Sequence, residues 1–315
     1  MSGIFTVSIF QSALELGCIY ALVALALFIS FTILNIADLT TDGCFTLGCA
    51  VGAMVTLSGH PFLALVAALI SGALAGFITA FLQTKLGVES ILAGIIVNTG
   101  LYTINIAVMG FSSLINLFGC DTIFSLGKDG VPYMIFGDWY KVITVAFIVA
   151  LIALALWWFL GTTLGMSIRA TGDNTEMVKS SSINPTFTIT VGLCLSNSLT
   201  GLSGCLIAQY QKSADINIGT GMVTLSLAAL IIGQTLIGNK GSTIRRILGT
   251  ILGSVLYRFI VAIALRMSVP AEALKLVSAI IVAVAIAAPY VRKKAALKKR
   301  EFVNYRDNRE VKENA

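Results

Sequence analysis

The sequence predicts an all-α protein that crosses a membrane about nine times, with eight to ten crossings as the margin. Hydrophobic residues make up 57% of the 315 residues and charged residues only 11%, whereas an ordinary soluble domain carries about 25% charge. Apolar runs near the roughly 20 residues that a membrane helix needs recur along the chain, with charges confined to the gaps. No alternating apolar and polar pattern of about ten residues occurs, which argues against an outer-membrane barrel.

These runs define a transmembrane domain over residues 1–290, followed by a basic tail over 291–315. The first run lacks a basic leader and a small-residue cleavage site, so we expect it to be retained as a span. The second run is short and contains glycine, so we expect a short or broken helix there. The nine predicted spans are 4–34, 44–57, 61–83, 91–111, 142–160, 185–209, 222–237, 247–265 and 273–290.

Basic residues predict the orientation of the chain. With nine spans, most Lys and Arg fall in gaps on the same side, at Lys85, Arg169, Lys179, Lys240, Arg245, Arg246 and in the tail. The positive-inside rule makes that side the cytoplasm, which places the N-terminus outside and the C-terminus in the cytoplasm. Nearly all of the net charge of +6 lies in the tail. We interpret the tail as an anchor to anionic lipid, and we expect no nucleic-acid partner.

The sequence predicts neither a metal site nor a catalytic site. The six cysteines show no C-x-x-C spacing and there is a single histidine, His60, so we expect free thiols and a loop histidine. No G-x-S-x-G motif or Ser/His/Asp set is present, which argues against an intramembrane enzyme.

The gap over residues 161–184 is unusually long and polar, reading GTTLGMSIRATGDNTEMVKSSSIN. Its apolar positions predict a helix, and residues 171–174 supply a turn and an N-cap for a second short helix. Two interpretations are open. The segment is a solvated connection, or it lies on the membrane surface and presents a helix to a soluble partner.

Three blocks of sequence carry a family resemblance. The first is T-L-G-x-x-I-R-A-x-G-D-N at residues 163–174, followed by Ser-Ile-Asn at 182–184. The second is I-L-N-I-A-D-L-T at 33–40 with Gly43 and Leu-Gly at 47–48, and the third is the glycine-punctuated stretch 230–253. In this order they resemble the permease subunits of ATP-binding-cassette (ABC) importers of the branched-chain amino acid, ribose and simple-sugar type.

The resemblance implies a bacterial inner-membrane permease that carries a small solute and is not itself an enzyme. A cytosolic ABC ATPase would use ATP and Mg²⁺, an extracytoplasmic binding protein would deliver the solute, and a second permease copy would complete a homodimer. No cofactor is expected on this chain, which has no G-x-x-x-x-G-K-[ST] motif. An amino acid, aromatic or branched, is the first choice of solute, and a sugar or nucleoside the second. The outer loop 112–140 would dock the binding protein, or merely cap the helices.

The resemblance assigns the contact with the ATPase to the cytoplasmic segment 162–184. Arg169 offers a charge-assisted contact there, and an anchor to lipid headgroups explains it equally well. Ser182 stands where many family members have glycine, and Asp38 and Asp42 also depart from the family pattern. The residues that the resemblance assigns to coupling are Leu164, Gly165, Arg169, Ala170, Gly172, Asp173 and Asn174.

Polar residues within apolar sequence are the candidates for the translocation path, because such groups usually face protein or water. The polar stretch from Asn35 to Asp42 is either a plain cytoplasmic turn or an unwound stretch inside the membrane, where irregular backbone is tolerated only if protein or a cavity surrounds it. Hydrogen bonding between helices explains each of these residues as well as a path does. The path candidates are Asn35, Asp38, Thr41, Asn98, Asn105, Asn197 and Gln234.

Small residues and buried charges give two further predictions. The pairs Gly72/Gly76 and Gly249/Gly253 are spaced for close helix packing. Glu15 and Arg258 lie near the middle of spans and, because an unpaired charge there is costly, we expect them to pair with each other.

The main competing function is an ion-coupled secondary transporter, for which Glu15 and Asp38 would bind protons or sodium. That function leaves the long cytoplasmic segment unexplained, and the sequence shows no paired repeat of broken helices.

Overall fold

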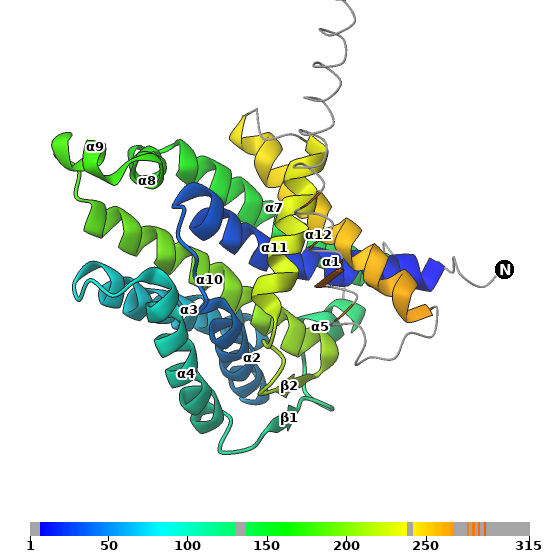
Figure 1. Ribbon diagram of the computed structural model, residues 1–315. Helices are drawn as coiled ribbons and strands as arrows, with labels where there is room; N and C mark the ends of the chain where they lie inside the picture. The colour runs from blue at the N-terminus through cyan, green and yellow to red at the C-terminus, as the bar shows by residue number, and fades with distance from the viewer. Residues whose placement is uncertain are drawn as a thin grey trace, which may run out of the picture.

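The computed structural model describes residues 7–129, 137–237 and 242–266, together with the single positions Leu276, Ala279, Ile280, Ala283 and Ala287. The described residues form a bundle of helices with one small two-stranded sheet (Figure 1). The helices are α1 (Val7–Leu27), η1 (Phe28–Ile33), α2 (Thr41–Leu57), α3 (Pro61–Thr84), α4 (Ser90–Val108), α5 (Ile123–Asp129), η2 (Gly137–Trp139), α7 (Tyr140–Gly161), α8 (Thr163–Asp173), α9 (Thr175–Ser180), α10 (Pro185–Gln211), α11 (Met222–Ile237) and α12 (Thr243–Arg266).

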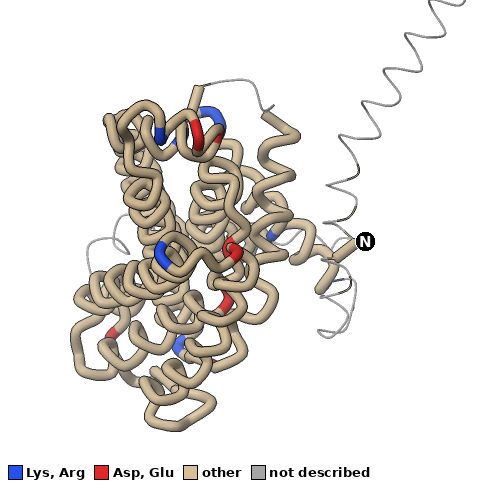
Figure 2. Tube along the Cα trace, turned by 60° about the vertical axis from the view of Figure 1, so that its left-hand side comes forward, with Lys and Arg blue, Asp and Glu red and all other residues tan. Residues whose placement is uncertain are grey.

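Helices occupy the predicted apolar runs within the described residues. Six of them are long and apolar enough to cross a membrane: Ile9–Ile33, Pro61–Thr84, Ser90–Val108, Tyr140–Gly161, Pro185–Gln211 and Thr243–Arg266. Two shorter apolar helices, Thr41–Leu57 and Met222–Ile237, match the second and seventh predicted spans. Charged residues are sparse along the traces of these helices (Figure 2). The ninth predicted span and the basic tail lie outside the described residues, apart from the five single positions.

Local sequence explains where several helices begin and end. Pro61 and Pro185 stand at the first positions of α3 and α10, where a missing N–H costs nothing. Asn184 caps α10 by accepting a hydrogen bond from the N–H of Thr186 at 3.0 Å. Lys212 ends α10 in the left-handed region, at φ +54°.

Helix α10 lies at the centre of the bundle and packs against α1, α2, α3 and α8. In its most apolar stretch, 83% of the residues are buried, whereas the share in α7 is 17%. Gly72 and Gly76 of α3 allow its close crossing with α10, because a Cβ at either position would collide with the backbone of Asn197 or Leu193. Gly253 of α12 meets α11 in the same way, and Gly249 lies against Gly233 of α11, where a Cβ would collide with the Gly249 carbonyl. Both predicted small-residue contacts are therefore confirmed.

The two strands join distant segments at one end of the bundle. Strand β1 (Leu114–Asn116) follows α4 and pairs antiparallel with β2 (Ser213–Asp215), which follows α10, with Leu114 opposite Asp215. We call this the ribbon end. Helices α8 and α9 lie at the opposite end (Figure 1).

The predicted ion pair between Glu15 and Arg258 is wrong. Glu15 accepts hydrogen bonds from the hydroxyl of Tyr210 at 2.6 Å and from the amide of Gln11 at 3.3 Å. The Arg258 guanidinium lies instead 3.6 Å from the centre of the Tyr20 ring. A cation over an aromatic face is stabilised by the ring quadrupole. Glu15 and Arg258 therefore have different partners, Tyr210 and Tyr20.

Candidate functional site

The polar stretch after η1 is an unwound segment packed inside the bundle. Helix α1 ends in the π-helical turn η1, and regular structure resumes only at Thr41. Between them, Asp38 and Thr40 are buried, and the Thr40 hydroxyl lies 2.9 Å from that of Thr79 in α3. The backbone of Leu39 lies so close to Gly94 of α4 that a Cβ there would be 2.8 Å from the Leu39 nitrogen. Of the two interpretations above, the geometry matches broken backbone enclosed by helices.

Asp38 joins this segment to the centre of α10. Its Oδ2 accepts a hydrogen bond from the Asn197 amide at 2.7 Å, and its Oδ1 accepts one from the backbone N–H of Thr40 at 2.9 Å. Asp38 is 2% exposed and Asn197 is fully buried. The hydroxyl of Thr41 donates to the Asp38 carbonyl at 3.2 Å. Three path candidates therefore form one polar cluster, and they are hydrogen-bonded to one another or to the backbone.

A second group of candidates lines a cleft of about 420 Å³ between α2, α4 and the loop that precedes α11. Asn98 and Asn105, seven residues apart on α4, both face it. The Asn105 amide also donates to the carbonyl of Gly43 at 3.1 Å. The remaining lining residues are Asp42, Gly43, Thr46, Thr99, Tyr102, Thr103, Ile216, Asn217, Gly219 and Thr220.

Sequence reasoning missed several of these lining residues. Tyr102 is four residues from Asn98, so helical spacing could have found it. Asn217 and Gly219 come from a loop more than a hundred residues along the chain, and no local pattern marks them.

Asp42 ties the two walls of the cleft together. It lies in the first turn of α2, and its carboxylate accepts hydrogen bonds from the N–H groups of Gly221 at 3.0 Å and Val223 at 2.9 Å. These residues flank Met222, where α11 begins. The carboxylate thus caps α11 and lies at the positive end of its helix dipole.

We expect Asp42→Ala to lower the free energy of unfolding by about 1 to 2 kcal/mol, because two N–H groups at the start of α11 lose their acceptor. Asp42→Asn keeps one side-chain oxygen and should lose less. Denaturant titration of the purified chain in detergent measures both, with exposed Asp121→Ala as the control. Equal stability of Asp42→Ala and the parent chain would contradict this cap.

The other two path candidates lie elsewhere. Asn35 is exposed, with φ at +56°, directly after the π-helical turn. Gln234 of α11 donates to the hydroxyl of Thr32 in that turn at 3.0 Å. The seven candidates therefore fall into the Asp38 cluster, the cleft, and these two positions beside η1.

The polar segment predicted over 162–184 forms two short helices, α8 and α9, at the end of the bundle opposite the ribbon. Asn174 caps α9, as predicted, by accepting from the N–H groups of Glu176 and Met177. The inner face of α8 buries Gly165, Ile168 and Thr171. Helix α8 exposes the large apolar side chains of Leu164 (41%) and Met166 (55%), and α9 exposes that of Met177 (58%).

Gly172 seats α8 on the end of α1. A Cβ at this position would collide with the carbonyl oxygen of Ile33 and lie 2.9 Å from the Leu34 Cα. One residue earlier, the hydroxyl of Thr171 lies 2.8 Å from that of Thr188 in α10. Helix α8 is therefore held against both η1 and the most buried helix.

The remaining residues assigned to coupling lie along α8. Gly165 packs on Phe159 and Leu160 at the end of α7, while Arg169 and Ala170 are half-buried and Asp173 is exposed. Arg169 forms no ion pair with any residue in the described ranges, where Lys179–Glu176 is the one such pair.

Ser182 follows α9 with φ at +60°, the left-handed conformation that glycine adopts without strain. The serine that replaces the family glycine therefore keeps the glycine-like backbone. No group of three or more His, Cys, Asp or Glu residues within the described ranges could hold a metal ion, and the six cysteines are free.

The chain is similar in sequence to known transport permeases. The model of a family described as "Branched-chain amino acid transport system / permease component" matches residues 9–303. The chain is 33% identical over 283 residues to the tyrosine transport system permease protein of Clostridioides difficile (strain R20291), an alignment that covers 90% of both chains. It is 30% identical over 285 residues to an uncharacterized protein of Rickettsia prowazekii (strain Madrid E), covering 89% of this chain and 97% of the relative. It is also 30% identical over 234 residues to the ribose import permease protein of Escherichia coli (strain K12), covering 71% and 67%.

Proposed function

The chain belongs to the family of permease components of branched-chain amino acid transport systems, and from this premise we propose that it forms the translocation path of an ABC importer for an amino acid. Members of this family are multi-pass inner-membrane proteins and transport subunits, whose ATPase is a separate subunit. The family also implies a substrate-binding protein as a partner.

The single observation that carries the proposal is that α8 and α9 expose large apolar side chains while they are anchored to the bundle. Leu164, Met166 and Met177 protrude from a segment that is firmly seated on η1 and α10. Exposed apolar groups on an otherwise polar, anchored segment mark a protein-binding surface. We assign the exposed surface of α8 and α9, which includes half-buried Arg169, to the ATPase.

The proposed orientation places α8 and α9 in the cytoplasm and the ribbon end outside. The N-terminus is then outside and the C-terminus inside, in agreement with the positions of Lys85, Arg169, Lys179 and the basic tail. A second copy of the chain completes the path as a homodimer.

The choice of an amino acid as the solute is supported by the relatives. The tyrosine permease matches over 90% of both chains, whereas the ribose permease matches over 71% and 67%. An aromatic or branched amino acid is therefore the first choice, and a sugar or nucleoside the second.

The test is uptake into proteoliposomes that contain the permease, its ATPase and its binding protein. We expect uptake of a labelled amino acid to require ATP on the side of the membrane where the ATPase is bound. Uptake should continue when a protonophore and a sodium ionophore are added. Uptake that continues without ATP and collapses with an ionophore would show a secondary transporter, for which Glu15 and Asp38 would be the carboxylates to examine.

Arg169→Ala should weaken binding of the ATPase by about tenfold, the loss of one charge-assisted hydrogen bond. Pull-down titration and ATPase activity stimulated by the binding protein measure this loss. Arg245→Ala removes the same charge from an exposed site at the start of α12 and serves as the control. If Arg169→Ala leaves assembly and ATPase activity unchanged, Arg169 is a lipid anchor.

A further inference from the structure

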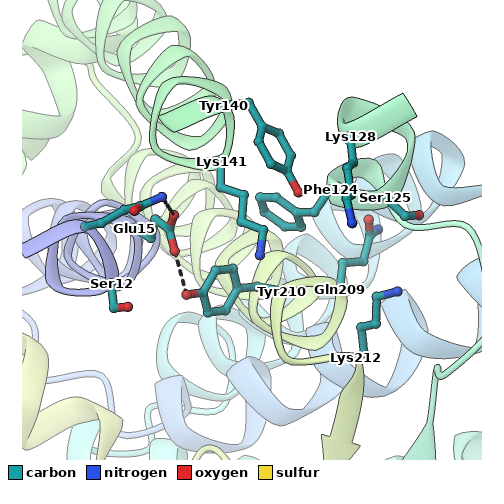
Figure 3. Close-up of a pocket in the computed structure, with 11 residues that line it drawn as sticks. Ser12, Glu15, Phe124, Ser125, Lys128, Tyr140, Lys141, Gln209, Tyr210 and Lys212 are labelled. Atoms are coloured by element: carbon teal, nitrogen blue, oxygen red, sulfur yellow. Dashed lines mark hydrogen bonds between the residues drawn. The ribbon is translucent and has the colours of Figure 1, made fainter. Parts of the chain in front are cut away.

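A second pocket, of about 640 Å³, opens at the ribbon end between α1, α5, α7 and α10. It shares no residue with the cleft beside Asp42. Figure 3 shows its lining, with Glu15 from α1, Lys128 from α5, Lys141 from α7 and Tyr210 from α10 converging on one hollow. None of these residues belongs to the coupling segment or to the Asp38 cluster.

Three aromatic rings form the apolar part of the lining. Phe124 and Tyr210 meet edge to face, with ring centres 5.7 Å apart, and Tyr140 stands above them in the view (Figure 3). Phe124 and Tyr140 are almost fully buried, so their positions are fixed by packing. Rigid aromatic walls suit a flat ligand, because rings gain from edge and offset contacts with one another.

Three lysines supply the positive charge of the pocket. The Lys141 ammonium lies 5.8 Å from the centre of the Tyr210 ring and 6.0 Å from that of Tyr140. In Figure 3, Lys128 lies above Gln209 and Lys212 below it. None of the three forms an ion pair with a residue whose side chain the structure describes, a set that leaves out Asp129 and Asp138. Like charges in one pocket repel, so a bound carboxylate would lower their energy.

Glu15 supplies a negative group on the opposite wall. It is 3% exposed, and it accepts one hydrogen bond from Tyr210 and one from Gln11. A carboxylate has about four acceptor positions, so Glu15 can still receive donors from a ligand. By contrast, the Gln209 amide is already committed, to the carbonyl of Pro61 and the N–H of Ile123.

We propose that this pocket binds an aromatic amino acid as a zwitterion. The lysines, with Lys141 foremost, hold the ligand carboxylate; Glu15 holds its ammonium group; and the rings of Phe124, Tyr140 and Tyr210 contact its side chain. The proposal rests on the proposed function, because it names the class of amino acid and the residues that read it. At the ribbon end, which faces outside in the proposed orientation, the pocket meets the solute before it reaches the Asp38 cluster.

The test is equilibrium binding to the purified full-length chain in lipid nanodiscs, without ATPase or binding protein. Four probes separate the contacts: L-tyrosine, tyramine without the carboxylate, 3-(4-hydroxyphenyl)propionate without the ammonium group, and L-alanine without the ring. We expect L-tyrosine to bind, and each of the others to bind at least about tenfold more weakly, the loss of one good contact.

Variants assign the contacts to residues. Lys141→Gln should weaken L-tyrosine binding about tenfold and leave tyramine binding unchanged, because tyramine has no carboxylate to lose a contact. Glu15→Gln should weaken L-tyrosine and tyramine and spare the propionate. Lys128→Gln, on an exposed side chain, tests the lysines again if Glu15→Gln fails to fold. Lys85→Gln, an exposed lysine after α3, is the matched control and should bind like the parent chain.

The proposal is overturned if L-tyrosine does not bind, if acetate displaces it as well as an aromatic amino acid does, or if the lysine variants bind it normally. Binding to the permease alone is separate from ATP-driven uptake. Uptake without binding in this pocket would therefore refute the site and leave the proposed function standing, whereas loss of ATP dependence would refute the function itself.

Discussion

Gly172→Ala should lower ATP-driven uptake at least about tenfold while leaving the transmembrane helices folded. The added methyl group has no space, because its position coincides with the carbonyl of Ile33 in η1. Overpacking of this kind costs about 1 to 3 kcal/mol unless the element moves away. Helix α8 lies at the end of the bundle, so it is the element that moves. The exposed side chains of Leu164 and Met166 then no longer meet the ATPase in the same position.

Three measurements check this expectation. Uptake should fall at least about tenfold, corresponding to a loss of 1.4 kcal/mol or more, ATPase binding should weaken, and the unfolding midpoint should change little. Gly161→Ala is the matched control, because a Cβ at the end of α7 meets no atom within 4 Å. Normal uptake by Gly172→Ala would mean that the seat of α8 on η1 has no part in coupling.

Asp38→Ala should cause the largest loss of stability among single changes in the polar cluster. It removes the stronger of two acceptors of the Asn197 amide, which keeps the Leu193 carbonyl at 3.2 Å, and it removes the acceptor of the Thr40 N–H, so one N–H on each side stays buried without a partner. An unsatisfied buried group costs about 1 to 3 kcal/mol, so we expect a loss of about 3 kcal/mol for the two.

A double-mutant cycle with Asn197→Ala separates a structural role from a transport role. Bonds between membrane helices average about 0.6 kcal/mol and reach about 1.7 kcal/mol, and a charged acceptor places this one near the upper value. We expect a coupling energy of about 1.5 kcal/mol from unfolding in mixed micelles. Additive losses would contradict a direct stabilising bond. Loss of uptake in Asp38→Ala beyond its loss of folded protein, absent in Asn197→Ala, would assign Asp38 to the path.

The positions of the apolar helices were predictable because the hydrophobic pattern alone determines which segments form them. The predicted run 222–237 coincides with α11, and the run 61–83 differs from α3 by one residue. The face shared by Asn98 and Asn105 followed from helical spacing, and the cap at Asn174 from residue type.

Pairings between distant residues were not predictable in the same way. Glu15 and Arg258 lie in helices that do pack together, α1 and α12, but the rotation of each helix about its own axis decides what a side chain meets. That rotation turns Glu15 toward Tyr210 and Arg258 toward Tyr20. The cap that Asp42 provides for α11 was missed for a similar reason, since its partners lie about 180 residues away. The transport roles of the path candidates stay predictions.

The burial of the two helices that leave the coupling segment has a mechanical consequence. The segment continues into α10, where 83% of the residues in the most apolar stretch are buried. It is preceded by α7, where the share is 17%. A force applied to α8 therefore acts on two arms of unequal stiffness. In the proposed coupling, α10 is held by close-packed neighbours and transmits displacement to the centre of the bundle, whereas α7 has fewer neighbours among the described residues and yields. Gly172, seated on η1, would then be the point about which the segment turns.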